Sequence, residues 1–238
     1  TYCTQNTFHN SDYFNDLIGT KLIAEGRFAD AIPYLKKVST ALLSSQLISV
    51  YSSQRQYDKP RWFGKQKVNE AYEPVTVNRN AKLDFCLDMT ECLSQYNLSR
   101  EGNEKKQMAY DIAVRYYQAS CYGDCWYLTH YYRSVMDSAR SWEKDFAAET
   151  VKYLNVAKRS DNQQLRYRSL YALAFMPVDP WMTTEYDYSN GYKEIAILHP
   201  QSAQYKALSE LDEFARNYPE AIDNYTRRCD VLKEFRQK

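Results

Sequence analysis

Apolar residues recur at helical spacing along most of this 238-residue chain, and this periodicity limits the folds that it can adopt. The clearest stretches are 79–96, 103–121 and 142–157, where apolar side chains return every three or four positions. Only 6 Gly and 7 Pro interrupt the chain, whereas an all-β protein with many tight turns would need more. Alanine and leucine also outnumber valine and isoleucine, which favours helices. We therefore expect an all-α fold.

Two short helices joined at Gly26 are predicted between residues 11 and 38. Ser11 or Asp12 offers an N-cap for the first helix, and Gly26 can adopt the positive φ that ends it. Pro33 falls inside the second helix, where it is tolerated near the first turn. The apolar positions of the pair are Phe14, Leu17, Ile18, Leu22, Ile23, Phe28, Ala31, Ile32, Leu35 and Val38.

This helix–Gly–helix unit, about residues 11–40, resembles a tetratricopeptide repeat (TPR). The matching positions are Ile18-Gly19, Leu22, Gly26-Arg27-Phe28, Ala31-Ile32, Leu35 and Val38. Gly19 and Ala31 would let the two helices approach closely, while Phe28 and Leu35 fill the space between them. The resemblance implies an irregular right-handed superhelix of antiparallel helical hairpins. It also implies that a protein or peptide partner binds on a concave surface without catalysis.

The rest of the chain does not repeat this unit regularly. A weaker parallel runs from Asn217 to Tyr225, at an offset of 190 residues that is not a multiple of the ~34-residue TPR period. Gly123 and Asp124 are predicted to separate the helix of 103–121 from another that begins at Trp126. Ser160 with Gln163 has the pattern of a capping box for a helix that ends before Pro177.

Two long aromatic-rich loops are predicted at 52–78 and 177–200, because both stretches lack periodicity and contain prolines. Their aromatic residues argue against full disorder. The first loop separates an N-terminal TPR-like hairpin, 1–51, from a helical-repeat-like region, 79–238. We expect that region to form one continuous α-solenoid domain.

Aromatic residues are concentrated between Tyr116 and Tyr132. On a helix from Trp126, the pairs Trp126/His130 and Tyr127/Tyr131 would each share a face, so two adjacent faces would be aromatic. One face would pack in the core, and the other either packs as well or lines a groove. Trp181, held near two prolines, has the same two interpretations. The candidate ligand-binding residues are Tyr117, Trp126, Tyr127, Tyr131 and Trp181.

No motif points to catalysis, a metal ion or a cofactor. The chain lacks a Gly-rich phosphate loop, a G-x-S-x-G elbow and an H-E-x-x-H pair. His9, His130 and His199 are far apart, and Cys121 and Cys125 are one residue too far apart for C-x-x-C. We expect the six cysteines to be packing thiols, with a Cys121–Cys125 disulfide, a zinc site or a catalytic thiol as alternatives. Paired carboxylates on helices are expected to lie on solvated faces.

The balance of charged residues and the first residue of the chain allow predictions about its partners and its cellular location. The chain has 31 Lys+Arg and 30 Asp+Glu, which predicts no nucleic-acid partner, and no apolar run is long enough for membrane insertion. It begins with Thr1 rather than Met, which predicts a processed or truncated product. Together with the cysteine count and the Tyr-, Asn-, Ser- and Gln-rich composition, this favours an extracytoplasmic bacterial protein, either periplasmic or at the cell surface.

The sequence thus predicts a non-catalytic scaffold that binds a protein or peptide partner. The alternatives are an exported carbohydrate-binding or surface-associated module, a structural spacer of a longer polypeptide, and an enzyme of an unrecognised helical class. An exposed row of aromatic rings would favour a glycan ligand. A groove lined by Asn, Lys and Arg would favour a peptide.

Overall fold

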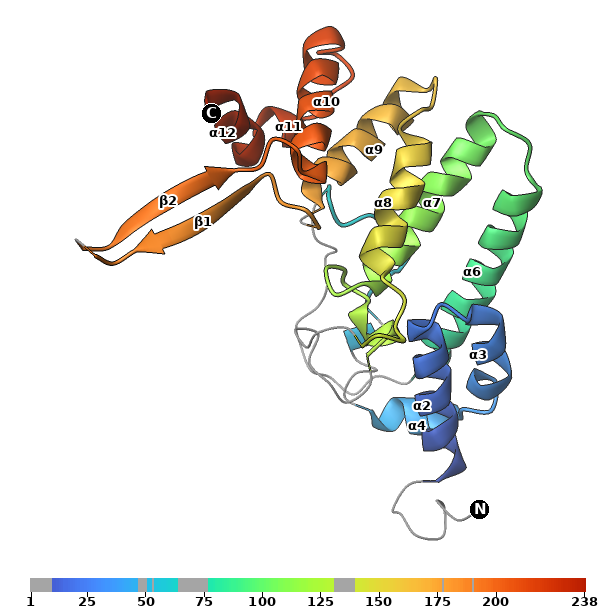
Figure 1. Ribbon diagram of the computed structural model, residues 1–238. Coiled ribbons are helices and arrows are strands. Elements are labelled where there is room, and N and C mark those ends of the chain that lie inside the picture. The colour runs from blue at the N-terminus through green and yellow to red at the C-terminus, as the bar shows by residue number, and fades with distance from the viewer. Residues whose placement is uncertain are drawn as a thin grey trace. The chain divides into compact units, whose positions relative to one another are not determined.

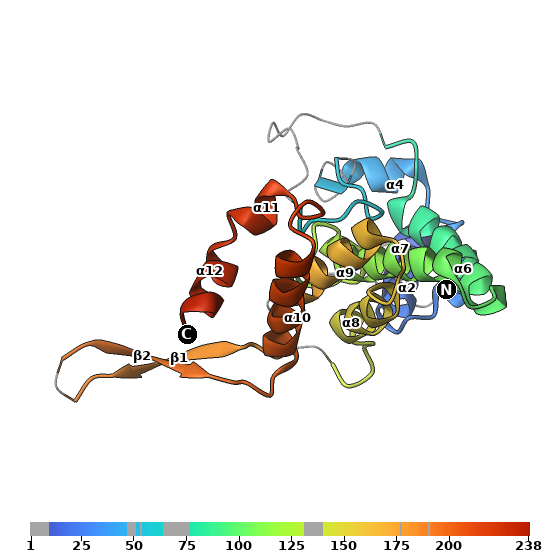
Figure 2. The same cartoon turned by 90° about the horizontal axis from the view of Figure 1, so that it is seen from above.

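The computed structural model describes residues 10–46, 51–52, 54–63, 77–130, 140–176, 178–189 and 191–238. This part of the chain is mostly helical and contains one two-stranded antiparallel sheet (Figures 1 and 2). It divides into two compact units. Unit 1 comprises Thr1–Ser99 and Asp111–Thr150, and unit 2 comprises Arg100–Tyr110 and Val151–Lys238. Residues on both sides of the predicted boundary at 52–78 belong to unit 1.

Helices make up most of the described residues of unit 1. They are α2 (Ser11–Ala24), α3 (Phe28–Leu35), α4 (Thr40–Ser45), α6 (Ala81–Leu98), the second half of α7 (Asn103–Ala119), the 3-10 turn η1 (Trp126–Leu128) and the start of α8 (Phe146–Ala157). The N-cap of α2 is Asn10, whose side chain accepts a hydrogen bond from Tyr13 N at 3.1 Å, so the predicted cap at Ser11 or Asp12 is one or two residues late. Gly26 has φ 76° and ends α2 as predicted.

The α2–α3 hairpin packs as the sequence predicts. A Cβ on Gly19 would lie 2.4 Å from Leu35 Cδ2, which confirms that the two helices need a residue without a side chain there. Phe28, Ala31 and Leu35 are buried, and α3 packs in turn on α6. The ring of Phe28 lies 5.6 Å from that of Phe85 in an edge-on contact. Leu35 therefore fills the space beside Gly19 between α2 and α3, as predicted, and Phe28 packs on α6.

Two further contacts hold the hairpin within unit 1. The N–H of Lys144 donates to the carbonyl of Ala24, the last residue of α2, at 2.8 Å. On the buried side of α2, both carboxylate oxygens of Asp16 accept a hydrogen bond from Lys82 Nζ at 2.9 Å. Both side chains of this ion pair are buried, so it fixes α6 against α2 at one position.

Unit 2 contains the remaining elements. They are the first half of α7, the rest of α8, α9 (Gln163–Phe175), β1 (Met182–Asp187), β2 (Lys193–Leu198), α10 (Ala203–Asn217), α11 (Asn224–Arg227) and α12 (Asp230–Gln237). Its core lies between α9 and α10, where Leu208, Leu211 and Phe214 are buried and the ring of Phe214 stacks on Tyr167 at 6.3 Å.

Three predictions about local structure are wrong. Met182–Asp187 and Lys193–Leu198 form the two antiparallel strands of a β-hairpin instead of part of a loop, with Met182 opposite Leu198 and Asp187 opposite Lys193. The helix expected from Trp126 is only the turn η1, and Thr129 and His130 are not helical. The N-cap of α9 is Asn162, because the Ser160 hydroxyl accepts from the N–H of Asn162 and does not cap the helix.

Other parts of the chain follow the prediction more loosely. Residues 54–63 and 77–80 form turns and irregular structure, in keeping with the loop expected at 52–78. Near the C-terminus, residues 218–223 form turns and α11 begins only at Asn224, so the second helix of the predicted TPR parallel is short and late. No helix in the described part combines the length and apolar character that crossing a bilayer requires.

Candidate functional site

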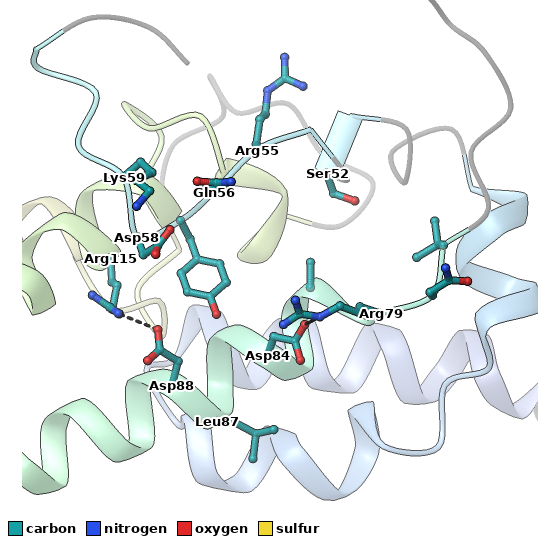
Figure 3. Close-up of a pocket in the computed structure, with 14 residues that line it drawn as sticks. Ser52, Arg55, Gln56, Asp58, Lys59, Arg79, Asp84, Leu87, Asp88 and Arg115 are labelled. Carbon is teal, nitrogen blue, oxygen red and sulfur yellow. Dashed lines mark hydrogen bonds and ion pairs between the residues drawn. The ribbon is translucent and has the colours of Figure 1, made fainter. Parts of the chain in front are cut away.

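A polar cleft opens in unit 1 between α6 and the segment 54–59 (Figure 3). Its volume is ≈ 940 Å³. Four basic and three acidic side chains line it, and polar groups such as Asn78 complete the wall. The charged residues are Arg55, Lys59, Arg79, Arg115, Asp58, Asp84 and Asp88. The cleft is therefore strongly charged but nearly balanced.

Helix α6 supplies one wall of the cleft. Asn80 caps this helix by accepting hydrogen bonds from the N–H groups of Lys82 and Leu83, and its own side-chain amide donates to the carbonyl of Leu35 at 3.1 Å. The cap thereby ties the start of α6 to α3. Asp84 and Asp88 follow at i and i+4, so both carboxylates lie on one helix face.

Each of these carboxylates forms an ion pair in the cleft (Figure 3). Arg79 Nε lies 2.9 Å from Asp84 Oδ2, and Arg115 Nε lies 2.7 Å from Asp88 Oδ2. Arg115 also donates to the carbonyl of Asp111 at 2.9 Å. Although burial opposes it, hydrogen bonding to Asp88 raises the pKa of Arg115, which keeps the guanidinium charged. The charges of these two pairs cancel, so this wall is electrically neutral.

The segment 54–59 supplies the opposite wall, and its charges are less engaged. Arg55 stacks over the ring of Tyr51, with the guanidinium carbon 3.1 Å from the ring centroid, and donates to the Tyr51 carbonyl at 2.8 Å. Asp58 and Lys59 are exposed, and neither forms an ion pair with another described residue. The carbonyl of Lys59 accepts a hydrogen bond from the Gln118 side chain, which anchors the segment to α7. This wall can therefore offer one free cation and one free anion to a ligand.

Tyr57 lies between the two walls. Its ring meets Phe85 edge-on at 5.2 Å. Burial, and then the negative charges of Asp88 and Asp84, raise the pKa of Tyr57 to about 12. The phenol is therefore neutral at physiological pH and keeps its proton as a hydrogen-bond donor inside the cleft.

The predicted aromatic residues lie mostly inside the units. Tyr117 is buried against Trp62, with ring centroids 4.8 Å apart, and Tyr127 is buried in the same unit. Trp181 is buried in unit 2, where its ring meets Phe235 at 5.6 Å. Tyr131 lies outside the described residues. These three buried rings pack in cores, the alternative that the sequence left open.

Trp126 is the candidate that stays partly exposed. Its ring lies 5.8 Å from that of Tyr51, and the ring of Tyr127 lies 6.1 Å from the same tyrosine. Because Arg55 stacks on Tyr51, this aromatic group reaches the wall of the cleft. The structure therefore connects Trp126 with the charged cleft of unit 1.

The charged residues of the cleft were missed by the sequence reasoning. Asp84 and Asp88 have the i, i+4 spacing that usually marks a solvated helix face, and Arg55 and Lys59 lie in a stretch without periodicity. The available signal was the density of charged residues in 52–78 beside an aromatic-rich flank. That signal identifies a region but not which side chains meet.

The cysteines and the acidic groups form no other site in the described part of the chain. Cys121 and Cys125 are free thiols, so the alternative of a disulfide between them is wrong. No group of three or more His, Cys, Asp or Glu side chains among the described residues is placed to hold a metal ion. No known protein family matches the chain, and no curated protein or solved structure matches it either.

Proposed function

We propose that this protein is a non-catalytic scaffold that binds an extended peptide segment of a protein partner in the cleft of unit 1. The observation that carries the proposal is the polar cleft of ≈ 940 Å³ lined by arginine, lysine and asparagine together with aspartate. A groove of this composition is the feature that favours a peptide over a glycan.

The charge arrangement supports a peptide that carries both signs of charge. The ion pairs of Arg79 with Asp84 and of Arg115 with Asp88 already balance each other. Lys59 and Asp58 are exposed and free to pair with an acidic and a basic side chain of a ligand. Charges of opposite sign on one wall select the direction and register of a bound peptide, because the reversed peptide would place like charges together.

We further propose that the helical hairpins follow the TPR manner of packing. The close approach of α2 and α3 at Gly19, and the packing of α3 on α6, support this arrangement in unit 1. In such a fold each hairpin covers the apolar face of the next, and the side chains between hairpins are free to line a binding surface.

The test begins with the selection of binding peptides from a random displayed library on the whole chain. The affinity of a synthetic copy of a selected peptide is then measured by fluorescence anisotropy. Lys59→Glu should weaken binding about tenfold or more, because it places a repulsive charge in the cleft. Lys36→Glu is the matched control, since Lys36 is an exposed lysine in the same unit outside the cleft.

The two variants should differ if the cleft is the binding site. Equal losses in Lys59→Glu and Lys36→Glu would mean that only overall charge matters and would overturn the assignment. Failure to select any peptide that depends on Lys59 would do the same.

A further inference from the structure

The β-hairpin of unit 2 has one face covered by tyrosines. In the antiparallel register Tyr186 is opposite Glu194, and opposite residues project from the same face. Tyr188 and Tyr192 continue this alternation toward the turn. The ring centroids of Tyr186 and Tyr192 are 5.8 Å apart, and those of Tyr188 and Tyr192 are 6.0 Å apart. We call these three residues the tyrosine face.

The tyrosine face is open to solvent. Tyr186, Tyr188 and Tyr192 are 52%, 71% and 64% exposed, although a tyrosine usually gains free energy from burial. The sheet has only two strands among the described residues, so one edge of each strand leaves backbone N–H and C=O groups unpaired. A hairpin of two strands is marginally stable by itself. A partner that covered this surface would bury the exposed rings and could hydrogen-bond to the unpaired backbone groups, so the surface has the features of a binding site.

One carboxylate lies on the same face as these rings. In the register Glu194 is opposite Tyr186 and projects from the tyrosine face, whereas Glu185, Asp187 and Lys193 project from the other face. With three acidic residues and one basic residue, the two strands carry a net negative charge. Asp187 accepts hydrogen bonds from the N–H and the hydroxyl of Ser189, which lower the pKa of this carboxyl. The hydroxyl of Tyr192 donates to Glu194, which raises the pKa of Tyr192 and keeps the phenol neutral. The neutral rings of the tyrosine face therefore lie beside the carboxylate of Glu194.

We propose that the tyrosine face binds an extended, arginine-rich segment of a partner protein. A guanidinium can stack on the face of a tyrosine ring and pair with a neighbouring carboxylate at the same time. An extended segment can also hydrogen-bond to an open strand edge of the hairpin. A neutral sugar would gain from the rings alone, whereas the charge of the hairpin complements a cation. This surface belongs to unit 2, whereas the cleft belongs to unit 1.

The probe is a fluorescein-labelled peptide of about ten residues with alternating arginine and threonine. Its binding to the whole chain is measured by anisotropy, beside a peptide in which neutral citrulline replaces each arginine. We expect the citrulline peptide to bind at least about tenfold more weakly, because it keeps the shape and loses the charge. Tyr188→Leu should weaken binding of the arginine peptide about three- to tenfold, since it removes a cation–π partner but retains an apolar side chain.

Two variants complete the test. Tyr188→Phe keeps the ring and should stay within about twofold of the native affinity, whereas Tyr225→Leu removes an exposed tyrosine from another surface of unit 2 and should also have little effect. Equal binding of the arginine and citrulline peptides, or an unchanged affinity in Tyr188→Leu, would overturn the proposal. A loss in Asp58→Lys, which places a repulsive charge in the cleft, without a loss in Tyr188→Leu would assign the peptide to the cleft and would also overturn it.

Two other ligands are tested with the same proteins. Binding of a neutral hexasaccharide that depends on Tyr188, without binding of the arginine peptide, would replace the proposal with a glycan site. Dimerisation that is abolished by Tyr188→Leu in sedimentation velocity, again without peptide binding, would replace it with self-association.

Discussion

The buried thiols and phenols of unit 1 resist ionisation. Burial raises the pKa of Cys86, Cys125 and Tyr117 to about 12 in each case. A nucleophilic cysteine needs the opposite shift, since the thiolate is the reactive form. At the scale of single residues, these side chains therefore have the properties of packing groups.

This burial predicts that the fold becomes less stable in alkali. Cys125 ionises in the unfolded chain near its usual pKa of 9.0, but in the fold only near 12, so the unfolded state loses its proton first. The contribution of Cys125 is complete below about pH 8 and falls as the pH rises from 9 toward 12. By pH 10.5 it should reduce the free energy of unfolding by about 2 kcal/mol.

Urea denaturation of the native chain and of Cys125→Ala measures this effect. The two stabilities should differ by a constant amount below about pH 8, and the native chain should then lose more stability than the variant. Parallel curves up to about pH 10.5 would show that the thiol is not the group responsible.

At the scale of elements, the α2–α3 hairpin depends on one missing side chain. A Cβ on Gly19 would approach both Cγ and Cδ2 of Leu35 within 2.6 Å, and Leu35 is itself buried. The leucine must therefore shift, or the helices must separate. Overpacking of this kind outweighs the better helix propensity of alanine.

We expect Gly19→Ala to destabilise the protein by about 1–2 kcal/mol, as measured by the urea midpoint at constant slope. Gly102→Ala is the control, because a Cβ on Gly102 would meet no atom within 4 Å. A smaller residue at position 35 should recover part of the lost stability. The double variant Gly19→Ala/Leu35→Val should therefore lose less stability than the sum of the losses in the two single variants. If Gly19→Ala is as stable as the native chain, the close contact does not constrain the hairpin.

Some of these helices and strands could be predicted from the sequence, and others could not. Helices with long apolar periods, such as α6 and α7, lie within two residues of their predicted limits. The β-hairpin was missed because its strands are exposed on both faces and carry no clear alternation, although Asn190-Gly191 is a turn signal. The helix predicted from Trp126 does not form beyond the turn η1. The chain before it is packed on the end of α7, where a Cβ on Gly123 would lie 2.3 Å from the carbonyl oxygen of Gln118, and local spacing does not show this contact.

The candidate site was harder to predict than the helices. Local spacing shows which residues share a helix face, but one wall of the cleft is the irregular segment 54–59, which the Gln118 side chain anchors to α7. No periodic pattern encodes such a contact between a loop and a helix. The site therefore depends on tertiary structure, while most of the fold depends on local structure.

At the scale of the whole molecule, the two units share two helices. The division between them falls after Tyr110, within α7, and after Thr150, within α8. Helical hydrogen bonds join each residue to the fourth one before it, so the bonds of both helices cross the division. Neither unit can unfold completely without disrupting helices that the other also uses.

We therefore expect both units to unfold in one cooperative transition. Hydrogen exchange with mass spectrometry at increasing urea concentration would follow peptides from α6 in unit 1 and from α10 in unit 2. Their midpoints should agree within about 0.3 M, an approximate margin for a single two-state transition. Two separate midpoints would show that the shared helices can fray at the division without loss of either unit.

The contact of Lys144 with Ala24 has a consequence for how such a protein can evolve. The sequence of the first hairpin resembles a repeat, yet the carbonyl of Ala24 at the end of α2 accepts a hydrogen bond from Lys144, far along the chain, and Phe28 packs on Phe146. A regular repeat can be duplicated, deleted or shuffled as a cassette, because each copy relies only on its neighbours. This hairpin relies on a distant segment, so a change in the number of hairpins would remove the contacts that hold it. We therefore expect such proteins to diversify by amino-acid substitution within the existing hairpins.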